Sequence, residues 1–249
     1  MYHGIKTDPQ SVPEGREIGA ELYDVPLERF AAQLTWLSDN NYSTLDLTEI
    51  DNCSQPKQVV LTFDDGEMNN FIHALPILQR LKFNAYFFII VERIGTPGYM
   101  GWDELRQLQE SGMKIGSHGL THRILTNLTD REVEEELAGS LKFLVNHLGD
   151  EINTLSIPRG FCDDRIIQTA YKLGYHHVFI SDRPGDLESN CWERIAIKTA
   201  WDVLRLAQAI DGIKPVNEQI LNWLKLVLKK SLNGEVYNRL RNTLISIYN

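Results

Sequence analysis

Two pairs of side chains in this chain of 249 residues have the types and spacing needed for metal-assisted hydrolysis. The first pair is Asp64 and Asp65, and two adjacent carboxylates repel each other unless they share a cation or a proton. The second pair is His118 and His122, which can bind one cation if a helical or turn-like backbone places them on the same face. Each pair also has a plain alternative, because Asp-Asp-Gly is a favourable turn sequence and the two histidines can be unrelated loop residues.

Asp65, His118 and His122 together form a more specific pattern than either pair alone. Such a set holds a divalent ion through three ligands and leaves open positions for water and substrate. Asp64 then remains free to act as a base. The three cysteines form no C-x-x-C pair, which argues against a thiolate zinc site and against a disulfide framework.

The elements that must position these residues follow from hydrophobic periodicity, because short apolar runs alternate with segments of helical spacing. Strands are expected at 58–63, 85–90, 114–117, 154–157, 177–180 and 194–197, with weaker candidates at 1–5 and 43–45. Helices are expected at 30–37, 72–81, 105–108, 129–147 and 166–173. This alternation predicts parallel strands, in a (β/α) barrel or an open doubly wound sheet. In both folds ligands bind at the carboxyl ends of the strands, where Asp64, Asp65 and His118 stand.

Composition excludes several classes of protein. Hydrophobic residues make up 43% and charged residues 24%, which is typical of a globular enzyme and excludes disordered and coiled-coil chains. The formal net charge of −9 makes the chain a poor candidate for binding nucleic acid. No apolar stretch approaches the length of a membrane span, and the first residues do not form a secretory signal. We therefore expect a cytoplasmic protein that neither crosses a membrane nor binds nucleic acid.

The sequence around both pairs resembles the polysaccharide deacetylases, the NodB-homology enzymes of carbohydrate esterase family 4. The segments 62–66 (TFDDG) and 117–122 (SHGLTH) are similar to the first two motifs of that family and occur in the same order. Segments 1–3, 85–88, 101–105 and 112–118 are also similar to family sequences. The resemblance covers residues 1–200.

The resemblance implies a distorted (β/α) barrel of seven or eight strands with a metal-dependent N-deacetylase site. Asp64 matches the catalytic base of the family, and its metal ligands match Asp65, His118 and His122. The implied cofactor is one divalent metal ion, with zinc as the expected identity. The third motif corresponds to residues 156–160, so the implied substrate-binding residues are Pro158, Arg159 and Gly160, with the backbone N–H of Arg159 in the oxyanion hole.

Two positions depart from the family pattern. Ser156 stands where the third motif commonly has an arginine that orients the catalytic aspartate. No histidine follows His177, although the last motif of the family usually supplies a histidine as general acid. We therefore predict that His3, at the end of the first expected strand, is the general acid, with His176 and His177 as alternatives. Asp182 lies in a turn-forming segment that could contact substrate or could be a plain turn.

The predicted function is the removal of acetyl groups from N-acetylated amino sugars in a polysaccharide, oligosaccharide or glycan precursor. One alternative is a related hydrolase of a non-sugar amide or cyclic imide. Another is a non-catalytic carbohydrate-binding protein that keeps the metal site. Residues 1–200 are expected to form the catalytic domain, and residues 201–249 a helical extension packed on the barrel. The apolar stripes of this extension could also form a homo-oligomer interface.

Overall fold

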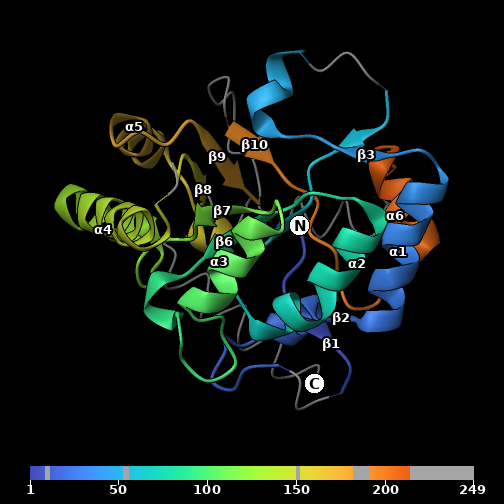
Figure 1. Ribbon diagram of the computed structural model, residues 1–249. Coiled ribbons are helices and arrows are strands. Elements are labelled where there is room, and N and C mark those ends of the chain that lie inside the picture. The colour runs from blue at the N-terminus through green and yellow to red at the C-terminus, as the bar shows by residue number, and fades with distance from the viewer. Residues whose placement is uncertain (9–11, 53–55, 150–151, 182–190, 214–249) are drawn as a thin grey trace.

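The computed structural model describes residues 1–8, 12–52, 56–149, 152–181 and 191–213, and its centre is a six-stranded parallel sheet (Figure 1). The strand order is β10-β9-β8-β7-β6-β5. The strands are β5 Thr62–Phe63, β6 Tyr86–Ile89, β7 Lys114–Ser117, β8 Thr154–Ser156, β9 His177–Ile180 and β10 Cys191–Glu193. The predicted α/β class with parallel strands is confirmed. The predicted count of seven or eight strands is not confirmed, since the described part of the sheet has six.

The first two residues of the chain connect the two edges of this sheet. Tyr2 forms a parallel bridge with Phe63, and its backbone N–H donates to the Thr62 carbonyl at 2.8 Å. On its other side, the backbone N–H of Ile197 donates to the Met1 carbonyl at 3.0 Å. Backbone hydrogen bonds thus run from β5 through the N-terminal segment to the chain that follows β10, and the six described strands form a parallel half-barrel.

Two short strand pairs lie outside the main sheet. They are β1 Ile5–Lys6 with β2 Val25–Pro26, and β3 Ser43–Thr44 with β4 Gln58–Val59. The predicted strand at 58–63 is therefore two strands, because the chain changes pairing partner after Val59. The prediction of a strand at 194–197 is wrong, since β10 ends at Glu193. An apolar run reports burial but does not specify which neighbour a strand pairs with.

Six α-helices cover the sheet in the described part of the chain. They are α1 Leu27–Asp39, α2 Leu75–Leu81, α3 Trp102–Glu110, α4 Asp130–Leu148, α5 Asp164–Lys172 and α6 Val203–Ile210. Short helical turns occupy Ala20–Tyr23, Leu47–Asn52, Asn70–Ala74, Val91–Arg93, Leu125–Asn127 and Pro158–Gly160. The predicted capping box begins α4, where the Thr129 N–H donates to the Glu132 carboxylate at 2.9 Å. Figure 1 shows α1, α2 and α6 together on one side of the sheet and α4 and α5 on the other.

The apolar faces of the helices pack on the sheet in two main clusters. In the first, Phe30 and Leu34 of α1 are fully buried against Phe63 and Phe87 of the neighbouring strands β5 and β6. In the second, α4 and α5 pack on β8 and β9, with buried residues Val133, Leu137, Ile166, Leu155 and Val178. Each fully buried side chain of this size contributes about 1.5–3 kcal/mol. The two clusters fix the strands whose carboxyl ends carry the polar residues.

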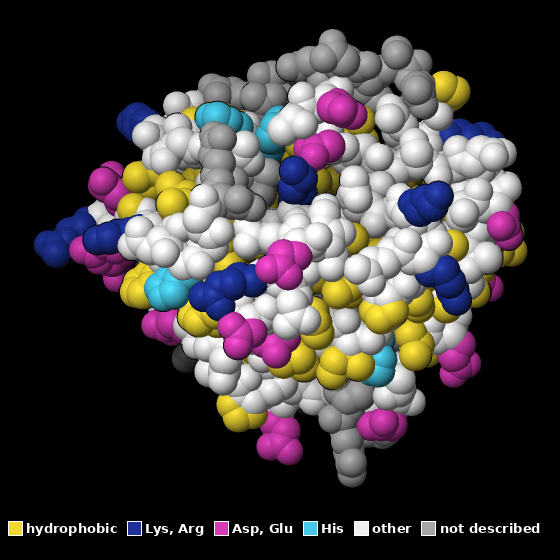
Figure 2. Space-filling view, viewed as in Figure 1, with side chains coloured by type: hydrophobic (Ala, Val, Ile, Leu, Met, Phe, Trp, Pro, Cys, Tyr) yellow, Lys and Arg dark blue, Asp and Glu magenta, His cyan; other side chains and the backbone are white. Residues whose placement is uncertain are grey.

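The surface shown in Figure 2 carries acidic and basic side chains interspersed, without a large patch of one sign. No helix within the described ranges has the length and apolar character needed to cross a membrane. Helix α6 lies in the predicted C-terminal extension and packs against α1. The apolar stripes predicted for residues 220–247 lie outside the described residues, and Asp182 does as well. The domain boundary and the oligomer interface therefore stay predictions.

Candidate metal centre

The two aspartates and His118 meet at the carboxyl ends of β5 and β7, which lie on either side of β6 in the sheet. Asp64 and Asp65 follow β5, and His118 follows β7. Asp65, His122 and Arg159 have φ angles of 75°, 65° and 61°. A left-handed backbone at residues other than glycine costs about 1–3 kcal/mol each and is typical of functional sites. The fold therefore holds strained residues at this rim.

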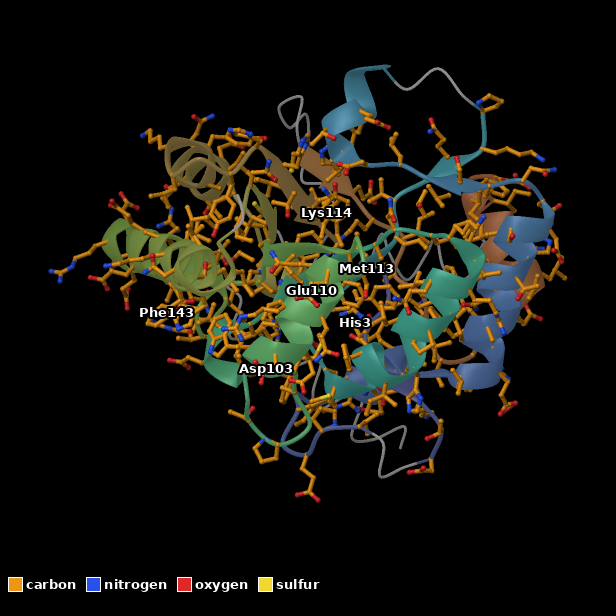
Figure 3. The ribbon with its side chains drawn as sticks, in the orientation of Figure 1. His3, Asp103, Glu110, Met113, Lys114 and Phe143 are labelled. Carbon is orange, nitrogen blue, oxygen red and sulfur yellow. The ribbon has the colours of Figure 1, made fainter. Side chains whose placement is uncertain are left out.

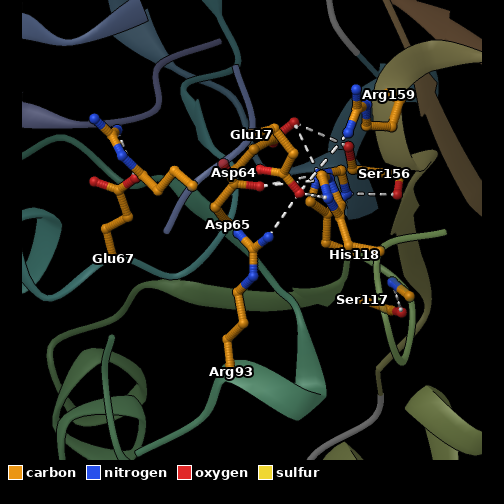
Figure 4. Close-up of polar contacts among 12 residues, drawn as sticks. Glu17, Asp64, Asp65, Glu67, Arg93, Ser117, His118, Ser156 and Arg159 are labelled. Atoms are coloured by element: carbon orange, nitrogen blue, oxygen red, sulfur yellow. Dashed lines mark hydrogen bonds and ion pairs between the residues drawn. The ribbon is translucent and has the colours of Figure 1, made fainter. Parts of the chain in front are cut away.

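Asp65, His118 and His122 lie close enough together to hold one metal ion (Figure 4). Their three candidate ligand atoms are within 4.8 Å of one another. Nε2 of His118 is 3.5 Å from Oδ1 of Asp65, and Nε2 of His122 is 3.6 Å from the same oxygen. Two ligands of a tetrahedral zinc ion with bonds near 2.1 Å are separated by roughly 3.4 Å. The observed spacing therefore fits a metal ion at the centre of the three atoms.

The state of the Asp65 carboxylate also fits a metal ligand. Its Oδ1 atom is buried and has no hydrogen-bond partner among the described residues. A buried charged oxygen without a partner is costly unless a cation compensates it. This unpaired oxygen faces both histidines, so the site has the donor set and the unsatisfied charge that a divalent ion requires. The identity of the ion does not follow from these atoms.

His118 is held in the form that binds metal. Its Nδ1 lies 2.8 Å from the carbonyl oxygen of Ser156, which can only accept a hydrogen bond. The proton is therefore on Nδ1, and the lone pair of Nε2 points towards Asp65. Burial lowers the pKa of His118 to about 4. The imidazole is consequently neutral at physiological pH, as metal ligation requires.

His122 is oriented in the same way by a residue that the sequence did not suggest. Its Nδ1 lies 2.8 Å from Oε1 of Glu17, which also receives a hydrogen bond from Arg93 at 2.6 Å. Burial alone would raise the pKa of Glu17, but His122 and Arg93 hold it well below its usual range. Nη1 of Arg159 lies 3.9 Å from the same Glu17 oxygen. Figure 4 shows Glu17 together with Arg93, Arg159 and His118.

The loop that carries both histidines is fixed by a buried acid from α4. The Glu136 carboxylate accepts hydrogen bonds from the backbone N–H groups of Leu120 and Thr121, at 3.1 and 3.0 Å, and from the Thr121 hydroxyl. Gly119 has a φ of 82°, and a Cβ atom there would lie 3.2 Å from Cγ of Pro158. The two loops are thus in close contact, and the third-motif segment Pro158–Gly160 lies beside the histidine loop.

Asp64 is buried next to the triad but has different partners. Its two carboxylate oxygens bind the guanidinium of Arg194 at 2.7 and 2.8 Å. Burial alone would raise the pKa of Asp64, but Arg194 and His118 hold it well below its usual range. Asp64 is therefore ionised and separately paired, as a base that is not a metal ligand would be. Arg194 was predicted to begin a strand and was not among the predicted site residues.

Among the candidate general acids, His3 is the one placed beside this centre. Its side chain is half-buried near the middle of the molecule (Figure 3), and its charge affects the pKa of Asp64. Nδ1 of His3 is buried and has no hydrogen-bond partner in the described part of the chain. His177 is the first residue of β9, at the opposite strand end from the site, and its Nδ1 accepts a hydrogen bond from Trp192. His176 is exposed.

The sequence matches known proteins along most of its described length. A family model described as polysaccharide deacetylase matches residues 51–178. The chain is 30% identical over 191 residues to a Bacillus subtilis protein named "Putative polysaccharide deacetylase YxkH", covering 74% of this chain and 64% of that protein. It is 28% identical over 126 residues to the peptidoglycan-N-acetylglucosamine deacetylase of Bacillus cereus, covering 50% of this chain and 57% of the enzyme. The chain therefore spans less than two thirds of either relative.

The fold is similar to solved structures as well. A polysaccharide deacetylase from Bacillus cereus superposes with a TM-score of 0.73 at 27% identity, covering 84% of this chain and 67% of that one. A deacetylase from Streptococcus pyogenes gives the same TM-score at 21% identity, which supports the fold alone, and covers 86% of this chain and 96% of that one. The matched segment contains both aspartates and both histidines of the candidate centre. The chain belongs to the polysaccharide deacetylase family.

Proposed function

We propose that the chain is a metal-dependent hydrolase that removes acetyl groups from N-acetylated amino sugars in a polysaccharide, oligosaccharide or glycan precursor. The observation that carries the proposal is the buried Asp65 oxygen, which has no hydrogen-bond partner in the described part of the chain and lies 3.5 and 3.6 Å from two oriented imidazoles. Family membership supplies the reaction class. Asp65, His118 and His122 would hold one divalent ion, with zinc as the proposed identity. When bound, such an ion activates water and polarises the acetyl carbonyl.

Asp64 is the proposed general base. A carboxylate offers about four lone-pair positions. Arg194 takes one on each oxygen, and the Ser156 hydroxyl takes a second on Oδ2 at 3.1 Å. One position on Oδ1 therefore remains to accept the proton of the attacking water. The carboxylate lies in the same buried site as the triad, with its Oδ2 atom 3.7 Å from Nε2 of His118.

His3 is the proposed general acid. Expulsion of the sugar amine requires a proton, since an amide anion is a very poor leaving group. The imidazole of His3 packs against the ring of Tyr23 at a centroid distance of 5.1 Å, while its Nδ1 atom has no partner in the described ranges. A histidine holds and releases a proton near neutral pH. His3 would give that proton to the leaving amine as the tetrahedral carbon collapses.

The segment Pro158–Gly160 is the proposed wall of the substrate site. Arg159 has a positive φ at the centre of this turn, next to the histidine loop. We propose that its backbone N–H donates to the oxygen that gains negative charge during attack, the type of contact worth about 10²–10³ in rate. Asp182 is retained as a proposed substrate contact on the basis of sequence alone.

The experiment that tests the function is acetate release from a panel of N-acetylated saccharides in the presence of added Zn²⁺, Co²⁺ or Mn²⁺. The panel contains monomeric N-acetylglucosamine, chitin oligomers, peptidoglycan fragments and a sugar-nucleotide precursor. Release from at least one saccharide, lost in Asp64→Asn, is the expected result. Ammonia or carboxylate release from simple amides or cyclic imides, without acetate from any saccharide, would contradict it.

A further inference from the structure

Arg194 makes the most extensive contacts with Asp64 of any described side chain, and it lies outside the segment matched by the family model. Its Nη1 is 2.7 Å from Oδ1 of Asp64, and its Nη2 is 2.8 Å from Oδ2. The side chains of Arg194 and Asp64 are 6% and 4% exposed, so water does not screen the pair. A two-point contact between a guanidinium and a carboxylate fixes the plane of the carboxylate as well as its position.

Ser156 and Thr62 complete the binding site of this guanidinium. Nη2 of Arg194 donates to the Ser156 hydroxyl at 2.7 Å, and that hydroxyl donates to Oδ2 of Asp64 at 3.1 Å. Nη1 also donates to the Thr62 hydroxyl at 3.2 Å. The small side chain of Ser156, at the position where an arginine was expected, therefore takes part in the contact that Arg194 makes from another part of the chain.

The guanidinium is also held by aromatic rings from two strands. Its central carbon lies 5.4 Å from the ring centre of Phe88 in β6 and 5.5 Å from that of Phe179 in β9. Both distances are within the range of cation–π attraction. Arg194 is thus fixed by four neighbours besides Asp64, and it cannot swing away without losing all of these contacts.

Distance alone does not decide which of the two aspartates binds a metal ion. Oδ1 of Asp65 is 3.5 Å from Nε2 of His118, and Oδ2 of Asp64 is 3.7 Å from the same nitrogen. The two carboxylates differ in their partners, because Asp64 has a cation on both oxygens, whereas Asp65 has a buried oxygen with no hydrogen-bond partner among the described residues. Arg194 therefore compensates the negative charge of Asp64, whereas the negative charge of Asp65 remains available to a metal ion.

We infer that Arg194 is a positioning residue that keeps Asp64 from ligating the metal ion and so reserves it as the base. This inference rests on the proposed metal site. Without the guanidinium, Asp64 is a buried carboxylate that lacks its counter-charge, and the bound ion becomes the nearest cation that can compensate it. Asp64 then enters the coordination sphere, and the site loses its free base while keeping its metal.

The test is the visible absorption spectrum of the full chain loaded with Co²⁺ alone, because an added ligand changes the position and intensity of the cobalt bands. Arg194→Ala is expected to shift the bands relative to the parent protein. Asp64→Asn is expected to keep the parent spectrum, and the double variant Arg194→Ala, Asp64→Asn is expected to return to it. An unshifted spectrum in Arg194→Ala, or a shift that persists in the double variant, would overturn the inference.

A second variant covers the case in which Arg194→Ala does not fold. Arg194→Lys keeps the positive charge, but an ammonium cannot hold both carboxylate oxygens in one plane. A smaller shift of the cobalt bands is expected, and the parent spectrum in this variant would count against the inference. These spectra need no substrate, so they test the role of Arg194 even if the parent protein releases no acetate.

Turnover supplies a further readout where the parent protein is active. Loss of the free base in Arg194→Ala is expected to lower kcat by roughly 10²-fold with little change in KM. Added guanidinium ion should restore part of kcat, whereas a merely structural loss would not be rescued. Arg165→Ala removes a partly exposed arginine paired with Asp130 and serves as the matched control, with parent kcat and parent cobalt spectrum.

Discussion

Nδ1 of His122 lies 2.8 Å from Oε1 of Glu17, although the two residues are 105 positions apart in the chain. The segment that carries Glu17 is fastened by its neighbour Arg16, which binds Asp24 at 2.6 Å and Glu67 at 3.0 Å. Glu67 is two residues beyond Asp65, a candidate metal ligand. The N-terminal segment is therefore attached to both sides of the candidate metal centre, and Glu17 orients the ring of His122, a candidate ligand.

Glu17→Gln is expected to weaken metal binding by about 10–100-fold, the usual effect of losing a carboxylate that orients a histidine ligand. The amide keeps the size of the side chain but removes the charge that holds the proton on Nδ1 of His122. Competition with a chelator of known affinity measures the change. Glu14→Gln, an exposed position in the same segment, is the control. Equal affinity of Glu17→Gln and the parent protein would show that His122 needs no such partner.

Asp64→Asn is expected to keep the metal ion and lower the rate of acetate release by roughly 10²-fold or more. The physical reason is that an amide cannot accept the proton of the attacking water. Metal content and turnover should be measured on the same sample. Loss of the ion together with the activity would mean that Asp64 is itself a ligand, which the proposed division of roles forbids.

His3→Gln is expected to keep fold and metal and to lower kcat by roughly 10²-fold, the scale of losing a general acid. The limb of the pH–rate profile that reports the acid should disappear with it. A substrate with a leaving group that needs no proton should restore the rate. Turnover of His3→Gln at the parent rate on the ordinary substrate would assign the proton donor to another group.

Stability of the metal-free protein should depend on pH through His118. Burial lowers the pKa of this residue from 6.5 to about 4. Between these two pH values His118 is therefore protonated in the unfolded chain but not in the folded chain. The free energy of unfolding therefore falls as the pH falls from 6.5 towards 4, by on the order of 3 kcal/mol for this group. Denaturant unfolding should be measured at several pH values in the presence of a chelator. The free energy of unfolding should depend less steeply on pH in His118→Gln than in the parent protein, and equally steeply in His176→Gln. The same slope in all three proteins would contradict the prediction.

The sequence predicted the parts of the fold and site that rest on local pattern. Local features include the C-terminal ends of the strands at residues 63 and 117 and the capping box at Thr129. The structure has all of them where they were expected. Asp65, His118 and His122 were grouped because each follows such an element, and they do come together.

The partners of these residues could not be predicted in the same way. Glu17 precedes β2 in an irregular segment, and nothing in its neighbours distinguishes it from the other acids of the chain. Arg194 was placed at the start of a strand, whereas it follows β10 and reaches Asp64, 130 positions earlier. Long-range contacts of this kind depend on how the sheet curves and on which edge the N-terminal residues occupy, and neither has a local signature.

The central claim is that the ion held by Asp65, His118 and His122 is required for acetyl removal. The most direct measurement is a titration of the metal-free protein with Zn²⁺, in which bound metal and acetate release from a chitin oligomer or peptidoglycan fragment are followed together. Acetate release is expected to rise in proportion to bound metal and to level off at about one ion per chain, with neither binding nor release in His118→Ala. Full binding of one ion without acetate release from any saccharide of the panel, or acetate release that does not depend on bound metal, would contradict the account.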